Sequence, residues 1–156
     1  MNNQERQTEP TITFEHIGVV VNDLVETARF FTALGFTCQE PFRVNGSWVE
    51  RIIGLTDVEV EGMFVTAPDG SGALELVKFH APARSGDPVD LPTNALGIRH
   101  IAYRVSDIET MVARASAAGY GLVGEVVNYE DIFLLAYVRG PEGLIVELAQ
   151  PVVRSS

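Results

Sequence analysis

The chain has 156 residues, enough for one ordinary domain or for two half-size modules that share a core. Hydrophobic residues make up 46% and charged residues 21%, which supports a packed core and excludes general disorder. The 11 basic and 21 acidic residues give a formal charge of −10 without any run of Lys or Arg, which argues against nucleic acid as a partner.

The longest apolar stretches are strand-sized, and residues 1–10 are polar without an apolar signal core. We therefore expect a soluble, cytoplasmic protein that does not use a membrane as a partner. A single cysteine, Cys38, excludes both an intramolecular disulfide and a cysteine-rich zinc site. We expect Cys38 to be a small, semi-buried residue at the start of a strand.

The first half of the chain predicts the order βαβββ. After a flexible leader at residues 1–11, the β-branched stretch 12–21 predicts a strand. Asp23 is a good N-cap for a helix, Glu26 follows three residues later as in a capping box, and Gly35 is suited to end this helix. The remaining strands of this half are expected at residues 36–42, 58–67 and 73–79.

Residues 43–57 carry no clear pattern beyond expected turns at Gly46 and Gly54. The stretch 81–96 contains three prolines and few large apolar residues, and it predicts a linker between two modules. The modules then comprise residues 12–80 and 97–150, followed by a tail at 151–156. The second module is expected to have a strand at 98–105, a helix at 107–118, and strands at 122–128, 132–139 and 144–149.

An internal repeat is the strongest signal in the sequence. The two halves align at an offset of 84 residues, without a gap from His16 and His100 to Phe36 and Tyr120. Identical residues at matching positions are His16 and His100, Ile17 and Ile101, Asp23 and Asp107, and Gly35 and Gly119. The repeat predicts an α+β fold of two paired βαβββ modules, which form a cupped, mostly antiparallel sheet with the helices outside.

Two kinds of metal-ligating residue recur at equivalent places in the modules. His16 and His100 lie on the first strands, and Glu75 and Glu147 lie in the middle of the fourth strands between apolar residues. A single His or Glu on a strand is more often a hydrogen-bonded or solvent-facing residue. A carboxylate buried on one face, however, needs a partner or a metal ion. Two imidazoles and two carboxylates suit one divalent ion of borderline hardness.

Three other acidic residues, Glu125, Glu130 and Glu142, are expected to be plain surface charges. His80, just after a strand at the start of the linker, is expected to lie outside the site.

The chain resembles the vicinal oxygen chelate superfamily, which includes glyoxalase I, methylmalonyl-CoA epimerase, extradiol dioxygenases and the bleomycin-resistance proteins. The resemblance covers roughly residues 12–150. The motifs that carry it are the stretches 16–24, 30–31, 34–36, 74–76, 97–105 and 143–148.

This resemblance implies a cupped site with metal ligands at His16, Glu75, His100 and Glu147. Such a quartet resembles that of nickel- or cobalt-type glyoxalase I, and the expected cofactor is one divalent ion of Ni, Co, Zn, Mn or Fe. Bleomycin-binding relatives lack the quartet, so its presence favours an enzyme. Extradiol dioxygenases use two His and one Glu, usually in a longer chain.

The implied activity is that of a lyase or an isomerase (epimerase), which transfers a proton α to a carbonyl on a substrate chelated through its oxygens. Glu147 or Glu75 would serve as the base. The epimerase pattern expects a further carboxylate where Met63 lies, with Glu59 and Glu61 near it. The alternatives are an iron-dependent oxygenase of a small aromatic or natural-product substrate, and a non-catalytic ligand-binding protein of the bleomycin-resistance type.

The expected partner is a small-molecule substrate. Arg104 alternates onto the same face as His100 and is the first candidate to anchor it. An aromatic lining is expected from Trp48, Phe64, Tyr103, Phe133 and Tyr137. A homodimer is also expected, because open sheet edges need covering.

Overall fold

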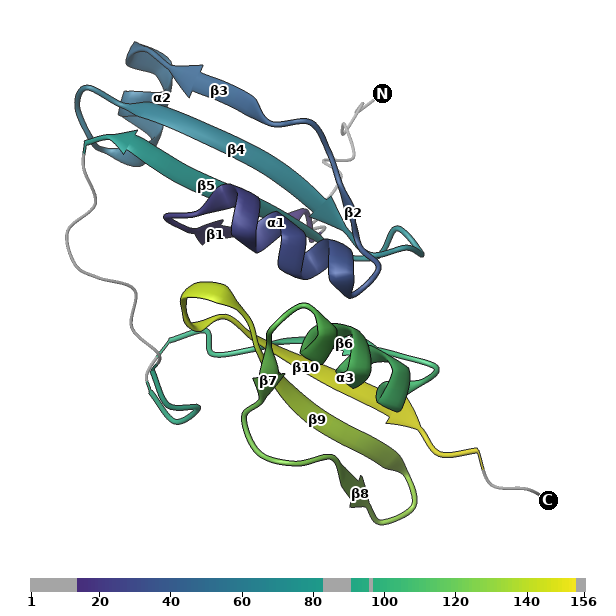
Figure 1. Cartoon of the computed structure of the whole chain (residues 1–156). Helices are drawn as coiled ribbons and strands as arrows, with labels where there is room; N and C mark the ends of the chain where they lie inside the picture. Colours follow the sequence, from purple (N-terminus) through teal and green to yellow (C-terminus); the bar gives the residue numbers. More distant parts are fainter. Residues whose placement is uncertain (1–13, 83–90, 96, 154–156) are drawn as a thin grey trace, which may run out of the picture.

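The computed structural model of the protein describes residues 14–82, 91–95 and 97–153. It confirms an α+β fold of two βαβββ modules, each built on a five-stranded mixed sheet (Figure 1). The expected leader at 1–11 and most of the expected linker at 81–96 lie outside the described residues. None of the helices in the described ranges is long and apolar enough to span a membrane.

The first module has the strand order β1-β5-β4-β2, and β3 also pairs with β4. Only β1 and β5 run parallel to each other. Its elements are β1 (His16–Val20), α1 (Leu24–Ala33), β2 (Thr37–Cys38), β3 (Phe42–Asn45), α2 (Ser47–Ile53), β4 (Glu59–Thr66) and β5 (Ala73–Ala81).

The second module repeats this topology with the order β6-β10-β9-β7, and β8 pairs with β9. Here β6 and β10 are the parallel pair. Its elements are β6 (Ile101–Arg104), α3 (Ile108–Ala117), β7 (Gly121–Leu122), β8 (Val127–Tyr129), β9 (Phe133–Arg139), the short 3₁₀ turn η1 (Pro141–Gly143) and β10 (Ile145–Pro151).

The helices α1 and α3 begin and end as the sequence predicts. The Asp23 and Asp107 side chains cap them, each accepting a hydrogen bond of 2.9 Å from a backbone N–H three residues later. Just after each helix a glycine adopts a positive φ, +94° at Gly35 and +92° at Gly119. The repeat in the sequence therefore includes one capped helix in each module.

Three stretches differ from the expectation. Gly46 and Gly54 bound the helix α2 instead of turns, because Gly54 ends it in the left-handed conformation at φ 72°. The single strand expected at 36–42 is split into β2 and β3 around Pro41, which has no N–H to donate to a ladder. Likewise, only the ends of the strand expected at 122–128 pair with β9, as β7 and β8.

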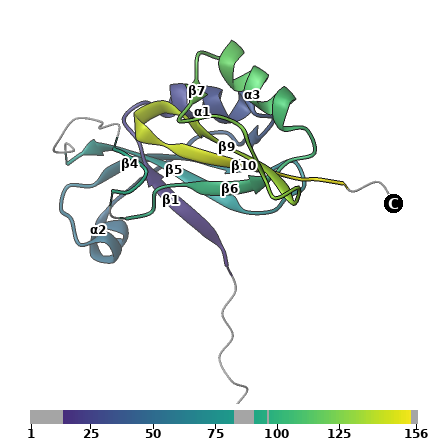
Figure 2. The ribbon, with the colours of Figure 1, turned by 90° about the horizontal axis from the view of Figure 1, so that it is seen from below.

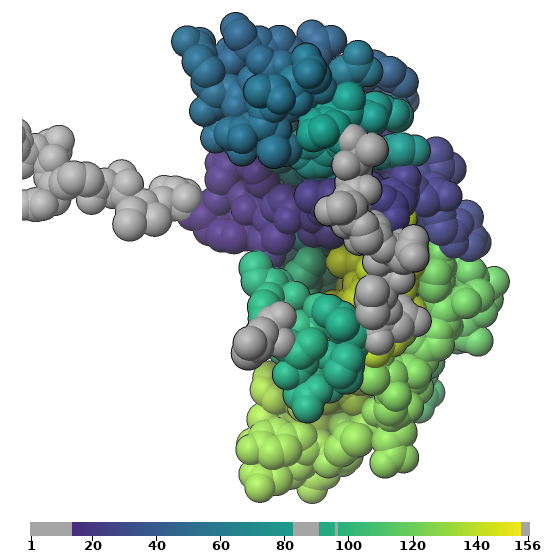
Figure 3. Space-filling view, turned by 90° about the vertical axis from the view of Figure 1, so that its left-hand side faces the viewer, coloured from purple at the N-terminus to yellow at the C-terminus, as the bar shows by residue number. Residues whose placement is uncertain are grey.

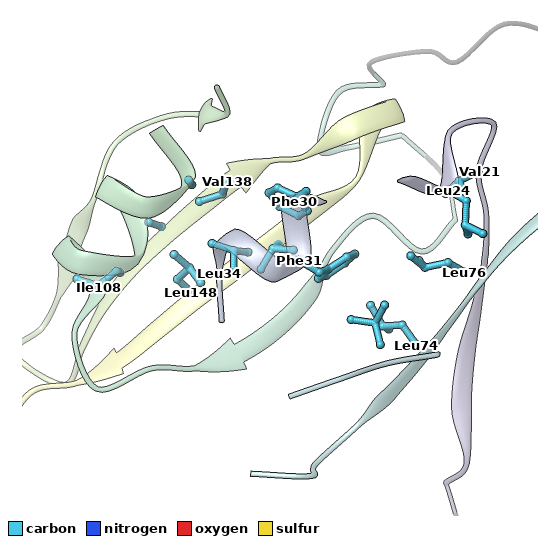
Figure 4. Close-up of a cluster of buried hydrophobic side chains, with 14 residues drawn as sticks. Val21, Leu24, Phe30, Phe31, Leu34, Leu74, Leu76, Ile108, Val138 and Leu148 are labelled. Carbon is cyan, nitrogen blue, oxygen red and sulfur yellow. The ribbon is translucent and has the colours of Figure 1, made fainter. Parts of the chain in front are cut away.

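One hydrophobic core joins the two modules. Phe30 and Phe31 on α1 are fully buried, and they share a cluster with Val138 and Leu148 of the second module (Figure 4). Contact is so close that a Cβ on Gly140 would lie 2.7 Å from the Phe30 ring. The two sheets are thus held together by α1, which packs against both.

Figures 1 and 2 show α1 and α3 on the same side of the two sheets. We call the opposite side the open face. The edge strands β1 and β6 flank the line between the modules, which we call the seam, and Figure 3 shows β1 in purple at this position. The two expected helices thus lie outside, whereas the unexpected helix α2 covers the far end of the open face, where Val49 packs with Val60 and Phe79.

Polar contacts cross the seam at two places along α1. Glu142 in η1 accepts hydrogen bonds of 2.7–2.9 Å from the backbone N–H groups of Asn22 and Asp23, at the helix N-terminus. The expectation that Glu142 is a plain surface charge is therefore wrong. At the second place, the Glu26 carboxylate forms an ion pair with Arg29 of the same helix. It also accepts a hydrogen bond across the seam from the hydroxyl of Tyr120. A hydrogen bond from Arg29, which has the larger effect, and one from Tyr120 lower the pKa of Glu26 to about 2.

We predict that Glu142→Gln lowers the free energy of unfolding by about 1 kcal/mol, because hydrogen bonds to a charged acceptor are stronger than those to a neutral one. Urea denaturation measures this difference. Glu125→Gln is the matched control, because Glu125 is an exposed loop residue and the change in net charge is the same. Equal stability of the two variants would contradict the role of Glu142 across the seam.

Candidate metal centre

Strand alternation turns both predicted carboxylates towards the open face. Leu74 and Leu76 are buried in the core, so Glu75 between them points to the other side of β5. In β10, Glu147 lies between the buried Val146 and Leu148, with the same consequence. The two Glu side chains therefore share the face that α1 and α3 leave uncovered.

Each carboxylate lies beside a histidine on the neighbouring parallel strand. His16 Nε2 is 3.2 Å from Glu75 Oε2, and His100 Nε2 is 3.1 Å from Glu147 Oε2. We call His16 with Glu75 the first half-site, and His100 with Glu147 the second. His100 lies immediately before β6, and its strand pairs with β10 as β1 pairs with β5.

The structure brings the four predicted metal ligands together as two pairs, not as one group. Within the ranges 14–82, 91–95 and 97–153, no three His, Cys, Asp or Glu side chains are close enough to hold one ion. Both half-sites nevertheless lie on the strands nearest the seam, and both face the same side.

Each half-site has an aromatic ring beside it, and only the ring of the second carries a hydroxyl group. In the strand registers, Phe64 lies opposite Glu75 and Tyr137 lies opposite Glu147. The Phe64 ring packs edge-on against His16 at 5.7 Å, whereas the Tyr137 ring lies 5.1 Å from His100. The Tyr137 hydroxyl is 3.5 Å from His100 Nδ1.

Burial, together with the nearby Glu147 carboxylate, raises the pKa of Tyr137 above its usual value. The phenol is therefore protonated at neutral pH, and it can either donate to His100 Nδ1 or accept from it.

The donor set fits a divalent ion. Imidazole nitrogen and carboxylate oxygen together suit Mn, Fe, Co, Ni and Zn, and four such donors leave positions free for substrate oxygens. When Nε2 of a histidine is a ligand, Nδ1 carries the proton and needs an acceptor. Tyr137 supplies that acceptor for His100, so the second half-site already has an outer partner.

The other residues predicted to contact substrate lie at different places. Phe133 shares the open face with Tyr137, while Trp48 lies half-exposed on α2. Tyr103 points to the opposite side of β6 from His100 and packs against Phe36, with ring centroids 4.7 Å apart. Burial raises the pKa of Tyr103 to about 12.

The middle of strand β4, around Glu61 and Met63, places no carboxylate beside either half-site. Met63 lies opposite the buried Leu76, so Met63 and Glu61 face the side of α1. Glu61 instead accepts a hydrogen bond from His80, whose Nε2 is 2.8 Å from the Glu61 carboxylate. His80 is thus paired away from both half-sites. An epimerase that uses a base at this position of the third long strand is therefore not supported.

The sequence is similar to one large family and to several solved structures. A family model described as the glyoxalase/bleomycin resistance protein/dioxygenase superfamily matches residues 15–137. A glyoxalase family protein from Bacillus cereus is 34% identical, with a TM-score of 0.87 over 96% of this chain and 100% of the other. A search of curated proteins gave no match.

More distant structures share the fold. The fosfomycin resistance protein FosX from Listeria monocytogenes, solved as a mutant with Mn(II), has a TM-score of 0.57 at 15% identity, and 90% of each chain is covered. A glyoxalase I mutant from Zea mays has a TM-score of 0.60 at 18% identity, covering 88% of this chain and 46% of the other.

We predict that Tyr137→Phe, which gives the second half-site a phenyl ring like that of the first, shifts the Nδ1 ¹⁵N resonance of His100 in the metal-free protein. The resonances of His16 stay in place, and the free energy of unfolding changes by at most about 1 kcal/mol. Nuclear magnetic resonance of ¹⁵N-histidine-labelled protein measures the shifts. Unchanged His100 resonances would show that the hydroxyl does not orient this ring.

Proposed function

Because the chain belongs to the glyoxalase/bleomycin resistance protein/dioxygenase superfamily, we propose that it is a metal-dependent lyase or isomerase of the glyoxalase type. The reaction would transfer a proton α to a carbonyl of a substrate bound through adjacent oxygens. The observation that carries this proposal is the pair of matching His–Glu half-sites on one open face. A protein that only sequesters a ligand has no need for them.

We further propose that both half-sites of one chain bind the same divalent ion. The strands that bear them flank the seam, α1 packs against both sheets on the opposite side, and the ligands face the same direction. In the ion-free conformation each carboxylate pairs with its own histidine instead. Binding of the ion would replace these two pairs by one shared centre.

The bound ion would supply a Lewis acid that polarises the substrate carbonyl. His16 and His100 would hold it, and Tyr137 would keep the His100 ring oriented through Nδ1. Glu147 is the better candidate for the base that removes the α-proton, because its side chain is 19% exposed, against 26% for Glu75. The protonated Glu147 would then return this proton to the neighbouring carbon, and Glu75, on the other side of the centre, is the alternative base.

We predict that protein loaded with zinc or nickel binds about one ion per chain, and that His100→Ala lowers this occupancy at least tenfold. His80→Ala is the matched control, because His80 pairs with Glu61 away from both half-sites. Elemental analysis after dialysis measures the occupancy. Two ions per chain would instead indicate that each half-site binds separately.

A homodimer is part of the proposal, because the edges at β3 and β8 are uncovered in the described chain and Ile52 and Tyr129 near them are exposed. Mixing His16→Ala with His100→Ala protein, after unfolding and refolding together, separates two arrangements. If each site lies within one chain, the mixture binds no more metal than its components. Recovery of about a quarter of an ion per chain would place the site across the dimer, because about half of the randomly formed dimers are mixed and each mixed dimer has one intact site.

We predict that the metal-loaded protein catalyses deuterium exchange at the α-carbon of hydroxycarbonyl compounds in heavy water, and that Glu147→Gln slows this at least 100-fold. Mass spectrometry of a panel of α-hydroxyketones and α-hydroxyaldehydes measures the exchange. Glu125→Gln again provides the control for the charge change. Oxygen consumption without exchange, in protein loaded with iron, would favour the oxygenase instead.

A further inference from the structure

The open face of the first module carries two aromatic rings that pack beside the first half-site. Phe64 lies opposite Glu75 in the strand register, and its ring contacts that of His16 edge-on, with the centroids 5.7 Å apart. The Phe42 ring follows, 5.6 Å from that of Phe64. Among the described residues, neither phenylalanine belongs to the core that joins the modules or to the smaller cluster under α2. Both rings are only partly buried, so they leave apolar surface uncovered.

Gly62 gives the Phe42 ring its place. Phe42 pairs with Gly62 in the register of β3 with β4. A Cβ on Gly62 would point to the open face, as the Phe64 side chain does, and it would lie only 2.4 Å from the Phe42 ring. The ring therefore covers the Gly62 backbone on this face. Val77 and then Val20 continue the same row across the sheet, and Val20 is 54% exposed. We call Val20, Val77, Phe42 and Phe64 the apolar patch.

The matching row of the second module differs in its chemistry. In the strand registers, the aliphatic Leu135 and Val127 take the places of the glycine and the phenylalanine that covers it. Arg104 takes the place of the first valine, and it is exposed on the same face as His100. The second half-site therefore has the Tyr137 hydroxyl and a guanidinium on its face, whereas the face around the first half-site carries phenyl rings and valines.

We infer that the apolar patch binds an aromatic ring of the substrate, whose chelating oxygens face the half-sites. This inference rests on the proposed function, and it narrows the substrate class to α-hydroxycarbonyl compounds with an aryl group beside the chelating carbons. Because Phe64 contacts the metal ligand His16, a ring attached directly to the carbonyl carbon reaches the patch without a spacer. Contacts between aromatic rings are favourable beyond the burial of apolar area. A charged group at this place would lose hydration without gaining a partner.

Two probes that share the chelating group, 2-hydroxyacetophenone and hydroxyacetone, test this inference. Titration of zinc-loaded protein labelled with ¹³C-phenylalanine, followed by nuclear magnetic resonance, measures both the affinity and the place of binding. The phenyl ketone is expected to bind at least tenfold more tightly than the methyl ketone and to shift the ring resonances of Phe42 and Phe64. Equal affinities, or shifts confined to other phenylalanines, would overturn the inference.

Three variants test the location. Phe42→Leu is expected to lower the ratio of the two affinities at least threefold without changing the metal occupancy. Gly62→Ala keeps the Phe42 ring but displaces it, and it is expected to cause a similar loss. Phe133→Leu, the same change on the open face of the second module, is expected to leave the ratio unchanged. A ratio that falls in Phe133→Leu and not in Phe42→Leu would place the ring on the other module and overturn the inference.

The same titration of metal-free protein separates this outcome from that of the metal centre. The apolar patch contains no metal ligand, so the preference for the phenyl ketone is expected to persist there at lower absolute affinity. If the protein binds no metal ion but keeps this preference and its dependence on Phe42, the metal centre fails and the patch stands. If the protein holds metal but binds both probes equally, the inference fails and the metal centre does not.

Discussion

The packing of α1 against both sheets is the constraint on which the rest of this structure depends. Phe30 and Phe31 are fully buried between the modules, and Gly140 leaves Phe30 the room that any side chain would take. Because α1 occupies one side of the seam together with α3, the other side of both sheets is left to the half-sites. The Glu142 carboxylate at the N-terminus of α1 strengthens the same junction.

The His–Glu pairs then follow from the strand topology. In each module the first strand lies parallel to the last one, so a histidine on the former and a glutamate on the latter become neighbours. A partly buried carboxylate is costly unless it is paired, and in each half-site the imidazole is the available partner. The pairs are therefore stable without an ion, and they present a donor set that fits one.

Much of this arrangement is present in the sequence. The offset between His16 and His100 predicts the repeat, the capped helices and the face of Glu75 and Glu147, because these depend on local periodicity. The helix α2 was missed because Val49 is its only buried residue, so no apolar period marks it. The role of Glu142 was missed because it depends on a contact across 120 residues, which no local pattern contains. The apolar patch likewise depends on the pairing of β3 with β4, which sets Phe42 over Gly62.

The measurement that tests the central claim most directly is the anomalous scattering of crystals grown with Mn(II) or Co(II). Our account predicts one strong peak per site, within coordinating distance of two histidine nitrogens and two carboxylates, which are those of His16, Glu75, His100 and Glu147 from one chain. Two separate peaks, each beside a single His–Glu pair, or a peak away from these four residues, would contradict it.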